Sequence, residues 1–151
     1  MNEAEFDSNV GVAIARAIRE RGIIPRVADV ASDLGVQASL IDASFARMAE
    51  RHVFTARKGS HEIYAYHPFC AEPTDFLVRA DGREWWAICG WDALGIAPAL
   101  GTTGTVDTRC GDCREPIHID VGLAGDARTS SGAVLHVGVP AREFWNDIYF
   151  T

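Results

Sequence analysis

The residues best suited to chemistry lie in one apolar segment, Trp85–Gly95, whose sequence is WWAICGWDALG. The segment holds one thiol, Cys89, and one carboxyl group, Asp92, three residues further on. We predict a helix from about Glu84 to Leu94, with Gly95 as its stop. Residues three apart in a helix lie on one face, about one turn apart. The thiol and the carboxyl group can then reach the same small ligand.

A thiolate can attack or coordinate a soft centre, and an acid whose pKa is raised by apolar surroundings can hold a proton for delivery. The three tryptophans of the segment would keep water away from both groups. The structural alternative makes Cys89 a small core side chain and Asp92 an exposed or capping acid. On spacing alone, this structural alternative is the stronger one.

Composition limits the class of protein. The chain has 151 residues, 48% of them hydrophobic and 23% charged, which suits one ordinary globular domain or two small ones. No run approaches the ~20 apolar residues of a membrane span. The N-terminal stretch MNEAEFDSN is acidic, unlike a signal peptide. We therefore expect a soluble, cytoplasmic protein with no membrane partner.

The N-terminal part has the pattern of a winged helix-turn-helix. Apolar spacings predict a helix over residues 8–21, a short one over 27–35 and a longer one over 37–51. Two alternating runs around Lys58-Gly59-Ser60 then predict a hairpin. We expect residues 1–67 to form a winged-helix-like N-terminal domain.

The second predicted domain, residues 68–151, is a small mixed α+β unit that begins near two prolines. A strand and turn with Asp81-Gly82 at the corner precede the tryptophan-rich segment. Alternating apolar residues predict three further strands, over residues 104–110, 116–121 and 133–139. The predicted fold class is α+β.

The stretch from His67 to Pro116 resembles the alkylmercury lyase (organomercurial lyase) family. The resemblance rests on HPFCAEPT, on WAICGWDALGIAPALG and on CGDCREP. In that family a cysteine precedes an aspartate by three residues in a motif like C-A-x-D-A-L, matched here by Cys89 to Leu94. The family also joins a winged-helix-like domain to a catalytic domain, so the resemblance extends over nearly the whole chain.

The resemblance implies cleavage of a carbon–mercury bond by protonolysis, which yields a hydrocarbon and mercuric ion. It makes Cys89 the thiolate that captures mercury, and Asp92 the group that takes the thiol proton and passes it to carbon. Hg(II) is a soft cation that prefers thiolate ligands. The implied partners are an organomercurial or another soft-metal compound as substrate, and thiol carriers or mercuric reductase as acceptors of the product. No cofactor is required.

The family's second mercury-binding cysteine follows a segment like FWNDIYFT, and this chain ends with that segment, at Thr151. We therefore expect residues 68–151 to lack the family's C-terminal segment. Three interpretations are open: a truncated relative, substitution by another thiol, or binding without turnover. Cys70, where the family more often has Ser, is a candidate stand-in thiol and mercury ligand. The alternative for Cys70 is a buried structural cysteine.

Cys110 and Cys113 form a C-x-x-C pair between two predicted strands. The pair suits half of a zinc site, a redox pair or a relay for mercury. His118 and His136 are candidate further zinc ligands by residue type only. In a reducing compartment the pair can equally consist of structural thiols.

Two other functions remain open. The same fold can hold mercury or another soft metal without cleaving a bond. It can also serve as a metal-responsive winged-helix transcription factor that reads DNA with residues 37–51. The net charge of -7 and the acidic residues within that helix argue against DNA as a partner. We favour a structural role for the N-terminal domain.

Overall fold

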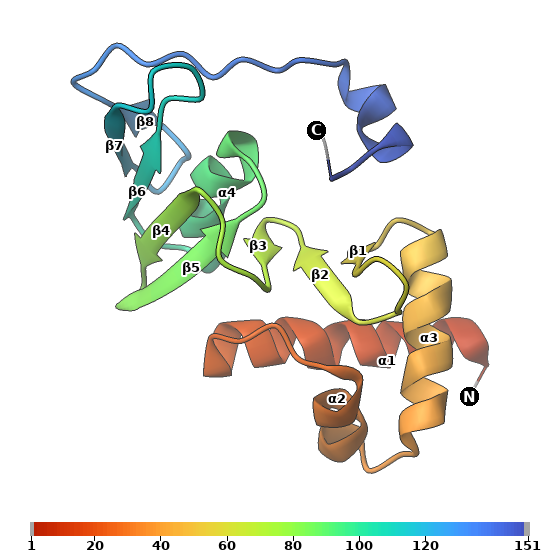
Figure 1. Cartoon of the computed structure of the whole chain (residues 1–151). Coiled ribbons are helices and arrows are strands. Elements are labelled where there is room, and N and C mark those ends of the chain that lie inside the picture. The colour runs from red at the N-terminus through yellow and green to blue at the C-terminus, as the bar shows by residue number, and fades with distance from the viewer. Residues whose placement is uncertain (1, 150–151) are drawn as a thin grey trace. The chain divides into compact units, whose positions relative to one another are not determined.

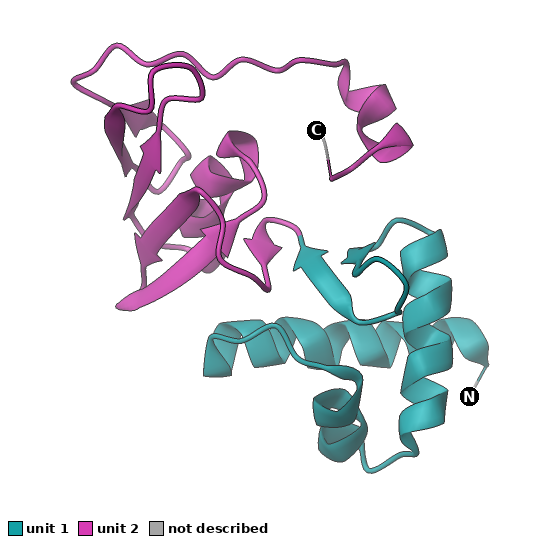
Figure 2. Cartoon of the chain, viewed as in Figure 1, with its two compact units in different colours: residues 1–66 teal, residues 67–151 magenta. Residues whose placement is uncertain are grey.

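The computed structural model describes residues 2–149 and divides into two compact units, Met1–Tyr66 and His67–Thr151 (Figures 1 and 2). Both units combine helices with antiparallel strands, and the predicted α+β class is confirmed. None of the described helices is long and apolar enough to cross a membrane.

The first unit begins with helix α1, Glu3–Arg16. A capping box starts it: the Asn2 side chain accepts from the Glu5 N–H at 2.9 Å, and Glu5 accepts from the Asn2 N–H at 3.0 Å. The helix continues into one wider π turn, Ala17–Arg21. Gly22, with a φ of 70°, then ends it in the left-handed conformation that glycine adopts readily.

Two shorter helices and a strand pair complete this unit, in the order that the sequence predicts. They are α2, Val27–Leu34, and α3, Ala38–Glu50, followed by β1, Thr55–Ala56, and β2, Ile63–Tyr66. The core of the unit consists of apolar side chains from the helices and from the start of the strand pair. Fully buried members include Val10, Ile14, Val30, Ile41, Phe45 and Phe54.

A buried carboxylate ties α1 to α3. Asp7 accepts hydrogen bonds from Ser44 Oγ at 2.6 Å, from Arg47 Nη2 at 2.6 Å and from Arg51 Nη2 at 2.6 Å. The hydrogen bond from Arg47 holds the pKa of Asp7 below its ordinary value of 3.8, against the opposing effect of burial. Two arginines of α3 and its end are therefore already paired with an acid of the same unit.

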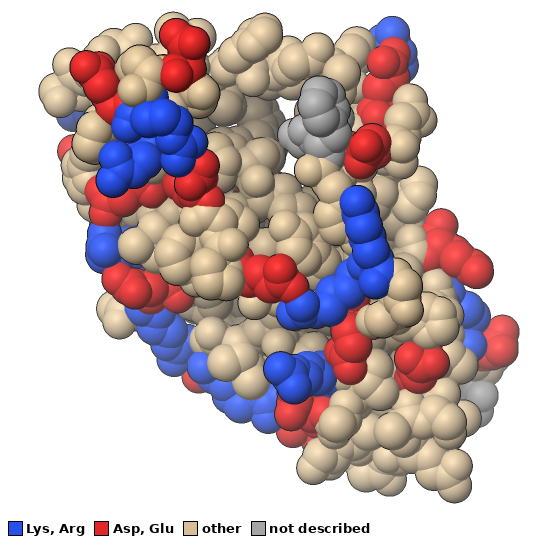
Figure 3. All heavy atoms as spheres, in the orientation of Figure 1, with Lys and Arg blue, Asp and Glu red and all other residues tan. Residues whose placement is uncertain are grey.

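Acids and bases also neighbour one another elsewhere. On the face shown in Figure 3, blue and red side chains lie interspersed, and no broad area carries basic side chains alone. Such a surface offers little to a phosphate backbone.

Replacing Asp7 with Asn should lower the free energy of unfolding by about 1–3 kcal/mol, because the arginines and Ser44 lose a charged acceptor. The lowered pKa means that this stabilisation is fully present above the ordinary carboxyl value of 3.8 and is lost as the pH falls through the lower folded value. Urea denaturation at several pH values measures both effects. Wild type and variant should converge in strong acid.

Asp33→Asn is the matched control. Asp33 pairs with Arg21 at 2.7 Å, but both side chains are more than a third exposed. Its loss should lower the free energy of unfolding far less, because solvent screens an exposed ion pair. Equal effects of the two substitutions would contradict a special role for Asp7.

The second unit contains an antiparallel sheet with the strand order β3-β5-β4-β6-β7-β8. The strands are β3, Phe69–Cys70; β4, Phe76–Ala80; β5, Arg83–Ala87; β6, Gly104–Arg109; β7, Pro116–Val121; and β8, Ala127–Arg128. Helix α4, Gly90–Leu100, packs against β4, β5 and β6. A 3-10 helix, η2, spans Ala141–Asn146.

The predicted corner at Asp81-Gly82 is confirmed. Asp81 has a φ of 54° and Gly82 a φ of 68°, the left-handed pair that a tight two-residue hairpin turn requires. The turn joins β4 to β5 in a regular ladder from Ala80↔Arg83 to Phe76↔Ala87. Because of this turn, the residues after Gly82 pair with β4 as a strand.

The predicted helix over residues 84–94 is therefore wrong. Its first half is strand β5, and α4 begins only at Gly90. Gly95 lies within α4, and the stop is Gly101, whose φ is 72°. Alternation in Arg83–Ala87 buries Trp85 and Ala87 on one face, and pairing with β4 outweighs the helical spacing of the apolar residues.

The predicted strand over residues 133–139 is also wrong. The segment has no regular secondary structure. Val134 is 88% exposed and Val137 49% exposed, so the alternation of apolar residues does not reflect a buried sheet face. The outer edge of β7 pairs instead with the short β8.

Candidate functional site

Cys89 lies at the junction between β5 and α4, as the N-cap residue of the helix. Its backbone is extended, with φ -146° and ψ 174°, and its carbonyl accepts the first helical hydrogen bond, from the Ala93 N–H at 3.0 Å. The thiol makes no capping hydrogen bond of ordinary geometry. The N–H groups of Trp91 and Asp92 nevertheless lie near enough to the sulfur to favour its thiolate. A helix start is electrostatically favourable for an anion.

Asp92 occupies the third position of α4, so Cys89 and Asp92 have the same relation as the two side chains of a capping box. The Asp92 side chain is 12% exposed. Its Oδ2 lies 2.8 Å from Nδ1 of His67. A thiol, a carboxyl group and an imidazole thus meet at the start of α4.

Burial raises the pKa of the Cys89 thiol above its ordinary value of 9.0, and the negative charge of Asp92 raises it further. The N–H groups at the helix start act in the opposite direction but do not prevail. Cys89 therefore keeps its proton at neutral pH, and a neighbouring base must take that proton when the sulfur binds a metal.

The three tryptophans do not together surround Cys89 and Asp92, as the sequence had suggested. Trp85 is 5% exposed and packs on Phe69, with ring centroids 5.0 Å apart. Trp91 is 69% exposed. The half-burial of Cys89 thus does not come from three surrounding indoles.

Two residues from the C-terminal part of the described chain lie at the site. Leu135 Cδ1 would stand only 2.6 Å from a Cβ added to Gly90, next to Cys89. The Trp145 ring meets the His67 ring nearly edge-on, with centroids 6.1 Å apart. Gly90, where the family motif has Ala, thus leaves room for the Leu135 side chain.

Cys70 is buried in β3, 6% exposed, and its backbone is opposite Trp86 in β5. None of the four cysteines forms a disulfide. The position of Cys70 fits the structural alternative, and its role as a stand-in ligand remains a proposal.

Cys110 and Cys113 lie in the turn between β6 and β7, between two strands as predicted. N–H groups of Cys113 and Asp112, together with the Cys113 thiol, lower the pKa of Cys110 below its ordinary value of 9.0. Within residues 2–149, no three His, Cys, Asp or Glu side chains gather around a place for a metal. His118, a candidate zinc ligand, lies instead 2.7 Å from Asp107 through its Nδ1.

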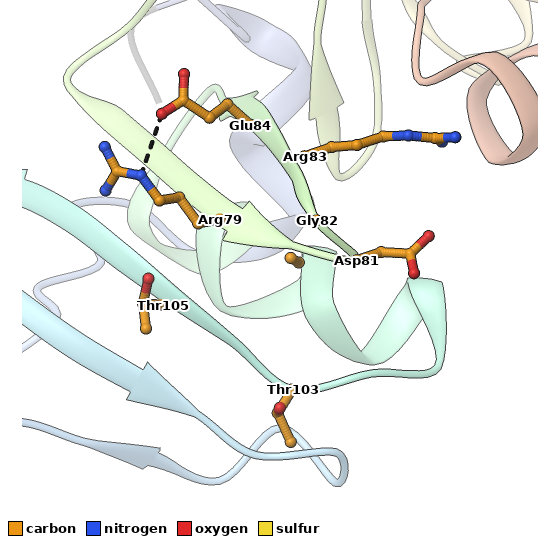
Figure 4. A pocket seen from close by; sticks show the side chains of 8 residues that line it. Arg79, Asp81, Gly82, Arg83, Glu84, Thr103 and Thr105 are labelled. Atoms are coloured by element: carbon orange, nitrogen blue, oxygen red, sulfur yellow. Dashed lines mark hydrogen bonds and ion pairs between the residues drawn. The ribbon is translucent and has the colours of Figure 1, made fainter.

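Two open pockets lie at opposite ends of the sheet. One surrounds the Asp81-Gly82 turn, with Arg79, Glu84 and Thr105 among its lining residues (Figure 4). Cys89 follows the other end of β5, so this pocket is not part of the thiol site.

The second pocket is lined by residues that precede β4 and residues of β6 and β7. They are Thr74, Asp75, Asp107, Thr108, Arg109, Pro116, Ile117 and His118. This pocket lies at the end of the sheet where β5 and β6 finish, because both strands run antiparallel to β4.

Fold and site together define a mixed α+β protein with a thiol and an acid at one helix start.

The fold is similar to that of a solved protein. A crystal structure described as the mercury-bound form of MerB2 matches this chain with a TM-score of 0.56 and 18% sequence identity, and the match covers 85% of this chain and 68% of that chain. At that identity the likeness shows the fold alone. No curated protein matches the sequence significantly. The model of the family described as MerB, alkylmercury lyase, matches residues 69–151. The chain therefore belongs to the alkylmercury lyase family, and the resemblance seen in the sequence is confirmed.

His67 is the residue that sequence reasoning missed, since its pattern indicates only a surface or strand-edge position. It lies 25 residues before Asp92, and only the fold brings the two side chains together. The one local signal was its place in HPFC, at the start of the stretch that carries the family resemblance.

The pKa of the Cys89 thiol should lie above the ordinary value, and the pKa of the Cys110 thiol should lie below it. Because the thiolate is the reactive form, alkylation of Cys89 by iodoacetamide should reach half its maximal rate above the ordinary thiol pKa of 9.0, and alkylation of Cys110 below it. Peptide mass spectrometry over a range of pH measures both sites in one sample. Scaling each rate to its own alkaline plateau removes the difference in exposure. A lower midpoint for Cys89 than for Cys110 would contradict this assignment.

Proposed function

We propose that this chain cleaves carbon–mercury bonds by protonolysis, with Cys89 as the mercury ligand and Asp92 as the proton carrier. The observation that supports this function best is the protonated, half-buried thiol beside a carboxylate at the start of α4. Family membership supports the same reaction. Mercury is here the substrate's own metal, and no resident cofactor is needed.

The first step exchanges ligands on mercury. The Cys89 sulfur forms a bond to mercury, the anionic ligand of the organomercurial leaves, and the thiol proton passes to Asp92. Burial supports this step, because a thiol that holds its proton until mercury arrives delivers that proton to the site rather than to water.

The second step breaks the carbon–mercury bond. Asp92 donates the proton to carbon, the electron pair of the bond goes to the new C–H bond, and the hydrocarbon leaves. A second thiolate stabilises the mercuric ion that stays on Cys89. Cys70 or a small thiol from solution can supply it, and thiol carriers or a mercuric reductase would then take the product.

His67 acts as a positioning residue in this scheme. When Asp92 is ionised, Nδ1–H of His67 donates to Oδ2, and when Asp92 carries the proton on Oδ1, Nδ1–H donates to the same Oδ2. The distance of 2.8 Å suits both arrangements. The imidazole can therefore hold the carboxyl group in one orientation through both steps.

Headspace gas chromatography of the whole chain with phenylmercury and excess small thiol tests the reaction. We expect benzene from the wild type. Asp92→Asn should lower the rate by about 10²–10⁴-fold, as loss of a proton-transfer group does, while mercury still binds to Cys89. Cys89→Ser should lose both binding at this site and cleavage.

Asp42→Asn is a matched control, because Asp42 also lies against a histidine, His61 at 3.0 Å, but in the first unit. It should leave benzene release unchanged. Absence of benzene from the wild type, with mercury still bound, would reject cleavage in favour of the binding protein. Full turnover by Cys89→Ser would reject the proposed site.

His67→Ala should lower kcat by about 10–100-fold, the usual effect of losing a residue that orients a reactive ligand, with KM little changed. Steady-state kinetics separates kcat from KM, and circular dichroism checks that the variant folds. An unchanged kcat with a raised KM would contradict the positioning role.

We infer that the first unit is a winged-helix-like structural domain rather than a DNA-binding domain. Arg47 and Arg51, arginines that a phosphate backbone would need, bind Asp7 instead.

A further inference from the structure

The turn between β6 and β7 is a closed loop that carries the two cysteines of the C-x-x-C pair. The Cys110 N–H donates to the Glu115 carbonyl at 2.9 Å, and the Arg114 N–H donates to the Cys110 carbonyl at 3.1 Å. Arg114 has a φ of 62°, in the left-handed region. These bonds close the loop so that Cys110 and Cys113 stand on one turn.

Several groups of the loop lie near the Cys110 sulfur. They are the N–H groups of Asp112 and Cys113 and the Cys113 thiol. Consecutive N–H groups in a turn form a concavity that binds anions, including metal-bound sulfur. The closed loop therefore keeps both sulfurs near one another, where a single ion can reach them.

The turn is anchored at the end of the sheet that carries Cys89. Arg114 binds Asp75, just before β4, through Nη1 at 2.9 Å and Nη2 at 3.3 Å. Strands β5 and β6 flank β4 and both run antiparallel to it, so Cys89 and Cys110 follow the same end of the sheet. Two strand spacings, or about 10 Å, separate strands β5 and β6 at that end.

We propose that Cys110 and Cys113 form a chelating dithiol that binds one mercuric ion and accepts the product of the Cys89 site. The choice of mercuric ion as cargo rests on the proposed function, whereas the dithiol site itself does not. In the transfer, the ion's bonds to the Cys89 sulfur and to the second thiolate break, and two bonds to the Cys110 and Cys113 sulfurs form. The two protons of the pair pass to the released thiolates, with no change of oxidation state. When the ion arrives from solution instead, the two protons go to solvent.

The ligand count favours mercury over zinc. Structural zinc takes a full tetrahedral set of ligands, and in the described part of the chain no third His, Cys, Asp or Glu joins the pair. Mercuric ion binds strongly to a pair of thiolates in linear coordination, and thiolate softness suits it. Exposure of Cys113 leaves the pair open to an incoming ion.

Direct titration with inorganic mercuric chloride tests the site without any lyase step. The whole chain carrying Cys70→Ser and Cys89→Ser retains only the pair, and native mass spectrometry should show one mercury per monomer with two protons lost. Adding Cys113→Ser, at an exposed position that folding tolerates, should weaken mercury retention against glutathione by about 10²-fold or more, the gain expected from linking two ligands. Circular dichroism checks that both variants fold.

Each outcome decides the proposal. Equal retention with and without Cys113 would overturn the chelate, as would mercury held only between two protein copies. Tight zinc binding by the pair that mercuric ion fails to displace would assign it to zinc instead. Because no organomercurial is used, these outcomes are independent of benzene release, which tests the Cys89 site alone.

Discussion

The start of α4 is the constraint on which the chemistry of the second unit depends. A tight turn at Asp81-Gly82 forces β5 to pair with β4, and the chain leaves that ladder at Ala87 with its direction fixed. The helix then begins one residue after Cys89. A thiol at the N-cap and an acid in the first turn are neighbours by the geometry of any helix start. Burial of Cys89 keeps the thiol protonated.

The sequence predicts the composition of this site better than its architecture. Cys89 and Asp92 follow from residue type, spacing and resemblance, and these signals are local. The boundary between β5 and α4 does not follow from local signals. The apolar run suits a helix as well as a strand, and pairing with β4 decides between them. His67 was not predictable from spacing, because a contact across 25 residues depends on the whole fold.

The same contrast holds elsewhere in the chain. The helices α2 and α3 and the strands β6 and β7 lie where periodicity predicts them. Residues 133–139 have a strand-like pattern of apolar residues, yet they form no strand, and Leu135 packs at Gly90 instead. An alternating pattern is evidence for a strand only where a partner strand is present. The local sequence alone does not show whether a partner strand is present.

The contact between Leu135 and Gly90 divides the site into parts that can change independently. The sulfur, the carboxyl group and the imidazole depend on the sheet and α4, whose geometry tolerates little variation. The Leu135 side chain at Gly90 comes from a segment without regular structure, where substitutions disturb no ladder. Replacing Leu135 by a smaller or larger side chain alters the space at Gly90 while the strands and α4 stay in place. The surroundings of the helix start can therefore change through the coil alone.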